Sequence, residues 1–154
     1  MSGLRSRLSA LRELRGIRET VLFAYLAMYA ASVPLLMRLP LPRLERLLTR
    51  PPGPVRPSAA RVERIAALVP IAIRAFYPLV RPGCLTRGVT LFWFLRRAGL
   101  DVELRFGVDP LKLEAADGHC WLVLDGEPLF EREDTRRFTE TYRFPMVAPA
   151  ASAA

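Results

Sequence analysis

Residues 84–108 read CLTRGVTLFWFLRRAGLDVELRFGV, and the hydrophobic period changes near their centre. Before Gly99 the apolar residues recur at helical spacing, which predicts a helix over residues 85–98 with Gly99 as its C-terminal cap. After Gly99 the segment DVELRFGV alternates apolar and polar residues, as a half-buried strand does. The stretch therefore predicts a long helix that leads directly into a sheet.

Residues 119–131, HCWLVLDGEPLFE, extend the strand pattern. Asp125-Gly126 interrupts them, and this dipeptide is a strong signal for a tight hairpin turn because both positions favour positive φ. We therefore expect two antiparallel strands on either side of this pair. Trp121, like the FWF run at residues 92–94, is predicted to be a core residue rather than part of a binding pocket.

Helices are predicted upstream of Cys84. Residues 59–80 have helical periodicity, and Ser58 is positioned to cap that helix. Residues 41–50, LPRLERLLTR, form a shorter amphipathic pattern. Because the helices precede the strands, the predicted fold class is α+β: N-terminal helices, a central helix carrying Cys84, then a small antiparallel sheet.

Residues 20–37, TVLFAYLAMYAASVPLLM, carry no charge and are about as long as a membrane span requires. Tyr25, Tyr29 and Pro34 weaken that interpretation. We expect a helix buried in the domain and keep membrane contact through residues 20–37 as the alternative.

The composition of the chain suggests where its domain boundaries lie. Residues 1–50 are predicted to be an N-terminal helical region, and residues 51–58, PPGPVRPS, a proline-rich linker. Residues 59–144 form the predicted core domain. The low-complexity residues 145–154 are expected to be a disordered tail.

The net charge is +8, and Lys112 is the only lysine. The arginines are spread along helical patterns without interleaved aromatic residues, so we expect no nucleic-acid partner. Two cysteines do not make a disulfide framework, which favours a reducing cytoplasm, with membrane association as the alternative. The chain has no asparagine and no glutamine. Mechanisms that need a side-chain amide are therefore excluded.

Cys84 follows Pro-Gly at the start of the predicted helix, and His119 is the only histidine. A helix N-terminus favours the thiolate form of a cysteine and offers free N–H groups to an oxyanion. An imidazole on the following sheet can take the thiol proton, so the two residues are candidates for nucleophile and base. Spacing alone does not decide between this pair and two unrelated core residues.

A histidine base needs an acceptor to fix its tautomer, and in this chain only a carboxylate can serve. Glu131 lies on the predicted return strand of the hairpin, where it can reach His119. Asp125 is the alternative, although a turn aspartate more often serves backbone geometry. We favour Glu131.

Cys120 is the second thiol. Neighbouring residues on a strand point to opposite faces, so Cys120 is expected to face away from His119 and to be a small core residue. The same divergence argues against a zinc site made by Cys84, His119 and Cys120. We expect no metal and no cofactor.

Four features follow one another from Cys84 to Glu131: CLTR at a helix start, LRRAG at its end, a strand ending in GV, and HCW on a strand that runs into DG. In this order they resemble the C-terminal half of the lasso-peptide B proteins, the leader peptidases of the transglutaminase-like superfamily. The resemblance implies a transglutaminase-like, papain-like fold with a Cys-His-Asp triad. Its cysteine falls on Cys84, its histidine on His119 and its aspartate on Glu131, so that glutamate replaces aspartate. Cys120 stands where the family usually has alanine.

The resemblance also implies a function. The chain would be a bacterial, cytoplasmic cysteine peptidase (a hydrolase) that removes the leader from a ribosomally made, lasso-type antibiotic precursor. It would resemble the stand-alone peptidase of split systems. Its implied partners are the precursor peptide, a separate small leader-binding protein and an asparagine-synthetase-like ring-closing enzyme. The alternatives are a catalytically impaired transglutaminase-like binding scaffold and a membrane-associated protein anchored by residues 20–37.

Overall fold

The computed structural model describes residues 16–49, 57–111, 118–131 and 133–146. Within them, helices precede a four-stranded sheet, which confirms the predicted α+β fold. The helices are α2 (Ile17–Leu36), α3 (Leu41–Leu48), α4 (Ala59–Ala75) and α5 (Cys84–Ala98); the strands are β1 (Glu103–Val108), β2 (Gly118–Leu124), β3 (Glu127–Leu129) and β4 (Thr139–Phe144); and the 3-10 helix η2 (Thr135–Arg137) precedes β4.

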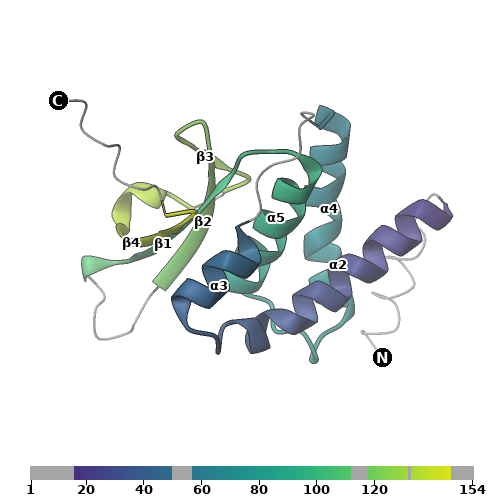
Figure 1. Cartoon of the computed structure of the whole chain (residues 1–154), viewed down its shortest axis with the longest axis horizontal. Coiled ribbons are helices and arrows are strands. Elements are labelled where there is room, and N and C mark those ends of the chain that lie inside the picture. The colour runs from purple at the N-terminus through teal and green to yellow at the C-terminus, as the bar shows by residue number, and fades with distance from the viewer. Residues whose placement is uncertain (1–15, 50–56, 112–117, 132, 147–154) are drawn as a thin grey trace.

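Helix α5 is the centre of the molecule and lies between the other long helices and the sheet (Figure 1). It contacts α2 and α4 on one side and β1 and β2 on the other. Phe92 and Leu95 are therefore fully buried. The helix ends at Gly99, whose φ of 104° is left-handed and is tolerated because glycine has no Cβ. The helix predicted over residues 85–98 is thus confirmed and begins one residue earlier.

The sheet has the strand order β3-β2-β1-β4, and every pairing is antiparallel. Strands β2 and β3 are joined by Asp125 and Gly126 with φ of 52° and 88°, the paired positive values of a type I′ turn. The predicted hairpin is confirmed. Strand β4, which the sequence analysis did not predict, pairs with β1 and brings Phe138 onto the face of the sheet that carries Trp121.

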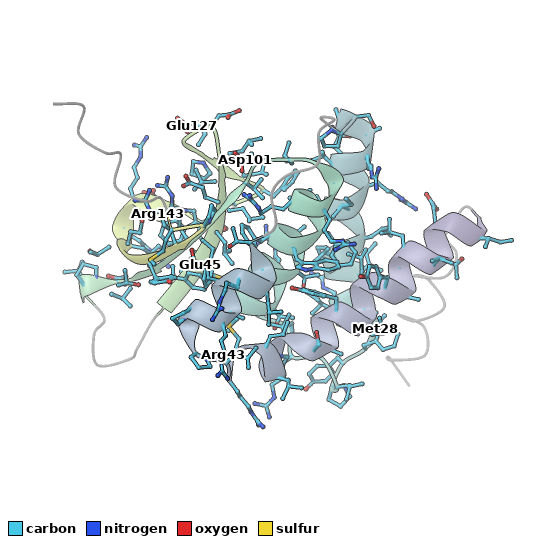
Figure 2. All side chains as sticks on the ribbon, viewed as in Figure 1. Met28, Arg43, Glu45, Asp101, Glu127 and Arg143 are labelled. Carbon is cyan, nitrogen blue, oxygen red and sulfur yellow. The ribbon has the colours of Figure 1, made fainter. Side chains whose placement is uncertain are left out.

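Helix α2 has one buried face and one exposed face. Leu26, Ala30 and Val33 are at most 1% exposed and belong to the core. Met28 and Leu35 are 64% and 66% exposed, and Met28 points away from the body of the molecule (Figure 2). By length and composition, Glu19–Leu36 is apolar enough to cross a membrane. The buried face of α2 agrees with the prediction of a core helix. Its exposed apolar face is compatible with the alternative, which is contact with a membrane.

The predicted linker at residues 51–58 and tail at residues 145–154 lie largely outside the described residues. The division into domains therefore stays a prediction. In the described part of the chain, Leu48 of α3 shares one hydrophobic core with Leu68 of α4 and Leu104 of β1.

Candidate active site

Cys84 is the first residue of α5 and follows Gly83, whose backbone is extended. No side chain of the described residues caps this helix, so the N–H groups of its first turn remain available. Thr86 Oγ1 donates a hydrogen bond of 3.1 Å to the carbonyl of Arg81 and ties the helix start to the preceding loop. The Cys84 thiol therefore lies at the positive end of the helix dipole, on a fixed backbone.

His119 lies near the start of β2, and its ring is held by other rings. It stacks on Trp121 at 6.1 Å and on Phe138 at 4.9 Å between ring centroids. Its Nε2 lies 3.2 Å from Oε2 of Glu131, and the two side chains are only 9% and 6% exposed. This bond leaves Nδ1 as the ring nitrogen that can face the thiol.

Glu131 reaches His119 from a different position than the sequence analysis expected. Strand β3 ends at Leu129, so Glu131 is not on the return strand but in the turn that follows it. Phe130 has a left-handed φ of 56°, which bends the chain immediately before Glu131. The guanidinium of Arg87, on α5, donates a hydrogen bond to the Phe130 carbonyl and holds this bend against the helix.

Asp125, the alternative carboxylate, is exposed in the turn at the far end of β2. It lies six positions after His119 along the strand, a distance of about 20 Å. The structure therefore brings Glu131 to the imidazole and leaves Asp125 away from it.

Cys120 is 4% exposed and packs in the main core, on the face of β2 opposite His119, as predicted. Its thiol nevertheless contacts the site. The pKa of the Cys84 thiol is lowered to about 5, first because the Cys120 thiol donates a hydrogen bond to it. The backbone N–H of Cys120 and the side chain of His119 add hydrogen bonds, and the charge of His119 acts in the same direction, while burial opposes the change.

An open cleft of about 310 Å³ runs past the thiol, the imidazole and the carboxylate. Helix α4 forms one wall, and the start of α5 with the turn around Glu131 forms the other. The lining residues are Pro70, Ile73, Arg74, Pro82, Gly83, Cys84, Arg87, His119, Glu131 and Glu133. A second depression of about 470 Å³ shares Pro70, Arg74, Arg87 and Glu131 with it, so the two adjoin.

Neither Arg87 nor Phe138 was predicted to be a site residue, although Arg87 ends the CLTR motif. Arg87 had a signal, because it lies three residues after Cys84 and therefore on nearly the same face of the helix. No pattern in the sequence indicated Phe138, since its contact with His119 depends on strand β4, which was not predicted. Among the residues that the structure describes, no group of three His, Cys, Asp or Glu side chains could hold a metal ion.

Comparisons with curated proteins and with solved structures found no match. A family model described as "Transglutaminase-like superfamily" matches residues 25–143, which run from α2 to β4 and include Cys84, His119 and Glu131. Members of this superfamily are often cysteine peptidases. With an α+β fold in which the cysteine opens a central helix and the histidine lies on the adjoining sheet, this chain belongs to the transglutaminase-like superfamily.

Proposed function

We propose that the protein is a cysteine peptidase that removes the leader from a ribosomally made, lasso-type precursor peptide. The observation that carries this proposal is the series of polar groups beside the cleft. The thiolate-forming Cys84 interacts with His119, and His119 is bonded to Glu131 at 3.2 Å. Cys84 would be the nucleophile, His119 the base and then the acid, and Glu131 the orienting carboxylate.

The proposed reaction begins with the Cys84 thiolate, which attacks the carbonyl carbon of the scissile bond. The carbonyl oxygen gains negative charge, and the free N–H groups at the start of α5 are placed to stabilise it. His119 then gives its proton to the departing amine. A water molecule, deprotonated by His119, hydrolyses the thioester and releases the carboxyl end of the leader.

Glu131 keeps its negative charge through both steps. Its bond to Nε2 holds the imidazole in the tautomer that presents Nδ1 to the thiol, and its charge stabilises the imidazolium. At 6% exposure this carboxylate is poorly screened by water, so its effect on His119 is larger than that of a surface carboxylate. Arg87 acts as a positioning residue, because it fixes the backbone that carries Glu131.

Two findings support the substrate class. The first is the superfamily match together with the resemblance of residues 84–131 to lasso-peptide B proteins. The second is the cleft, which is open to solvent and shallow, so it suits an extended peptide segment better than an enclosed small molecule. The proposed partners are the precursor, a small leader-binding protein that presents the scissile bond to Cys84, and an asparagine-synthetase-like enzyme that closes the ring afterwards.

The test is cleavage of a lasso-type precursor peptide, with a leader-binding protein present, followed by mass spectrometry. We expect a single cut that frees the N-terminus of the core peptide, and no product with Cys84→Ala. Asp125→Asn is the matched control and should cleave normally, since that carboxylate lies far from the site. If the wild-type protein binds the precursor but leaves it intact, the protein is a binding scaffold and the proposal is wrong.

A further inference from the structure

The two cysteines of the chain lie side by side, although 36 positions separate them. Gly88 is one helical turn after Cys84 on α5, so the two residues share a face of the helix. The Sγ of Cys120 lies against this face, because a Cβ built on Gly88 would be 2.9 Å from it. Cys84, Gly88 and Cys120 together line a void of only about 10 Å³, which leaves almost no free space between the helix and β2.

The two thiols are free and chemically unequal. Cys84 is half-buried at the edge of the cleft, and its thiolate is stabilised by the hydrogen bond from Cys120. Cys120 is enclosed in the core, and both its hydrogen bond to Cys84 and its burial raise the pKa of its thiol. An accessible thiolate next to a sheltered thiol is the arrangement of a peroxide-reactive cysteine with its resolving partner.

We propose that Cys84 and Cys120 form a reversible disulfide when the protein meets hydrogen peroxide, which switches off the nucleophile and protects it from irreversible oxidation. The inference needs a reactive Cys84 and its neighbour, and it does not require that the protein be a peptidase.

The chemistry balances in two steps. The Cys84 thiolate attacks one oxygen of the peroxide; a sulfur–oxygen bond forms, the oxygen–oxygen bond breaks, and hydroxide leaves. The Cys120 sulfur then attacks the sulfenic sulfur of Cys84; the disulfide forms, and the sulfur–oxygen bond breaks. The departing hydroxide takes the proton of Cys120 and leaves as water. In sum, one thiolate, one thiol and one hydrogen peroxide give one disulfide, one hydroxide and one water.

The first step makes the second one easier. The negative charge of the Cys84 thiolate is one of the causes that raise the pKa of the Cys120 thiol, and this charge is lost when Cys84 becomes a neutral sulfenic acid. Arg87, which acts in the opposite direction on Cys120, remains in place. Cys84 and Cys120 line the same void of about 10 Å³, so the two sulfurs are neighbours at the contact between α5 and β2.

The experiment treats the full-length protein with dilute hydrogen peroxide and follows it by intact mass, by a dimedone probe for sulfenic acid, and by peptide mapping. We expect the wild type to lose two hydrogen atoms, to give a linked peptide containing Cys84 and Cys120, and to recover both thiols in dithiothreitol. Cys120→Ser keeps a hydroxyl donor at the same place but cannot form the disulfide. It should take up dimedone on Cys84 roughly tenfold more than the wild type, and dithiothreitol should not restore its thiol after long exposure.

Cys120→Ala repeats this comparison without the hydroxyl and covers the case in which the serine variant does not fold. Because loss of the Cys120 thiol raises the pKa of Cys84, dimedone labelling of each protein is divided by the amount of Cys84 thiol that the same protein loses to peroxide. Equal dimedone labelling of Cys84 in the wild type and in a folded variant would overturn the inference, as would a wild-type map without the linked peptide. The readout is covalent and needs no substrate. Failure of this proposal is therefore distinct from failure of the proposed function.

Discussion

His119 contacts two aromatic rings and one carboxylate, and these contacts have different consequences. Trp121 and Phe138 restrict the plane of the ring, whereas Glu131 sets which nitrogen carries the proton. The rings can orient a neutral imidazole as well as a charged one. Aromatic faces also attract a cation, but only the carboxylate sets the tautomer, so the proton transfer proposed for the site depends on Glu131.

Replacing Glu131 by glutamine keeps the shape of the side chain and removes its charge. For the proposed peptidase reaction, we expect kcat to fall on the order of 10²-fold, or about 2.7 kcal/mol of transition-state stabilisation, because the amide cannot stabilise the imidazolium. KM should change little. Cleavage kinetics of Glu131→Gln beside Asp125→Asn, with both folds checked by circular dichroism, measure this. If Asp125→Asn loses activity while Glu131→Gln keeps it, then Asp125 and not Glu131 is the carboxylate of the site.

The pKa of about 5 for Cys84 predicts an unusual pH dependence. Iodoacetamide reacts with the thiolate, so its rate of reaction with Cys84 should reach half its maximum near pH 5 rather than near the ordinary value of 9. The folded-state pKa is depressed. Cys84 therefore contributes stability that is complete above about pH 9 and is lost as the pH falls through about 5.

The contribution of Cys120 is tested in the same measurement. Cys120→Ala removes the largest of the causes that lower the pKa of Cys84, so the midpoint of its alkylation profile should move to higher pH. Cys120→Ser retains a hydrogen-bond donor, so the midpoint of its alkylation profile should lie between those of the wild type and of Cys120→Ala. A wild-type midpoint near pH 9, the ordinary value for a thiol, would contradict the arrangement described for Cys84.

At the scale of elements, the closeness of α5 to β2 depends on a residue without a side chain. A Cβ at Gly88 would lie 2.9 Å from Cys120 Sγ and 3.1 Å from Leu104 Cδ1, both closer than ordinary contact. Glycine in a helix interior costs about 1 kcal/mol relative to alanine. The close approach of the helix to the strand offsets this cost, because it buries Cys120 and Leu104 against the helix.

Gly88→Ala should therefore destabilise the protein by about 1 kcal/mol, since overpacking at about 1–3 kcal/mol outweighs the gain in helix propensity. In a Cys120→Ala background one of the two clashes is gone, and the same change should be neutral or stabilising. Urea unfolding of the wild type, both single variants and the double variant gives the coupling free energy. Additive effects would show that the helix and the strand do not meet at these two residues.

At the scale of the whole molecule, sequence patterns predicted the elements that depend only on residues close together in the chain. The helix over residues 85–98, its glycine cap and the Asp125-Gly126 turn follow from periodicity and from residues that tolerate positive φ. The α+β order follows from the sequence of those elements. The His119–Glu131 proximity was expected from the hairpin, although the structure achieves it differently.

What could not be predicted depends on contacts between distant parts of the chain. Strand β4 is recognisable only through its pairing with β1, and Phe138 reaches His119 only because β4 pairs there. Glu131 was placed on a strand because nothing local indicates the left-handed φ of Phe130, a residue that rarely adopts it. The hydrogen bond from Arg87 to that residue's carbonyl joins α5 to a turn 43 positions later, beyond the reach of any periodicity.

That hydrogen bond joins the two halves of the site. Cys84 lies on α5, and Arg87 of the same helix holds the backbone next to Glu131. His119 lies on β2 and is bonded to Glu131. The alignment of the proposed nucleophile with its proposed base therefore depends on how closely α5 fits against β2, where Gly88 lies against Cys120.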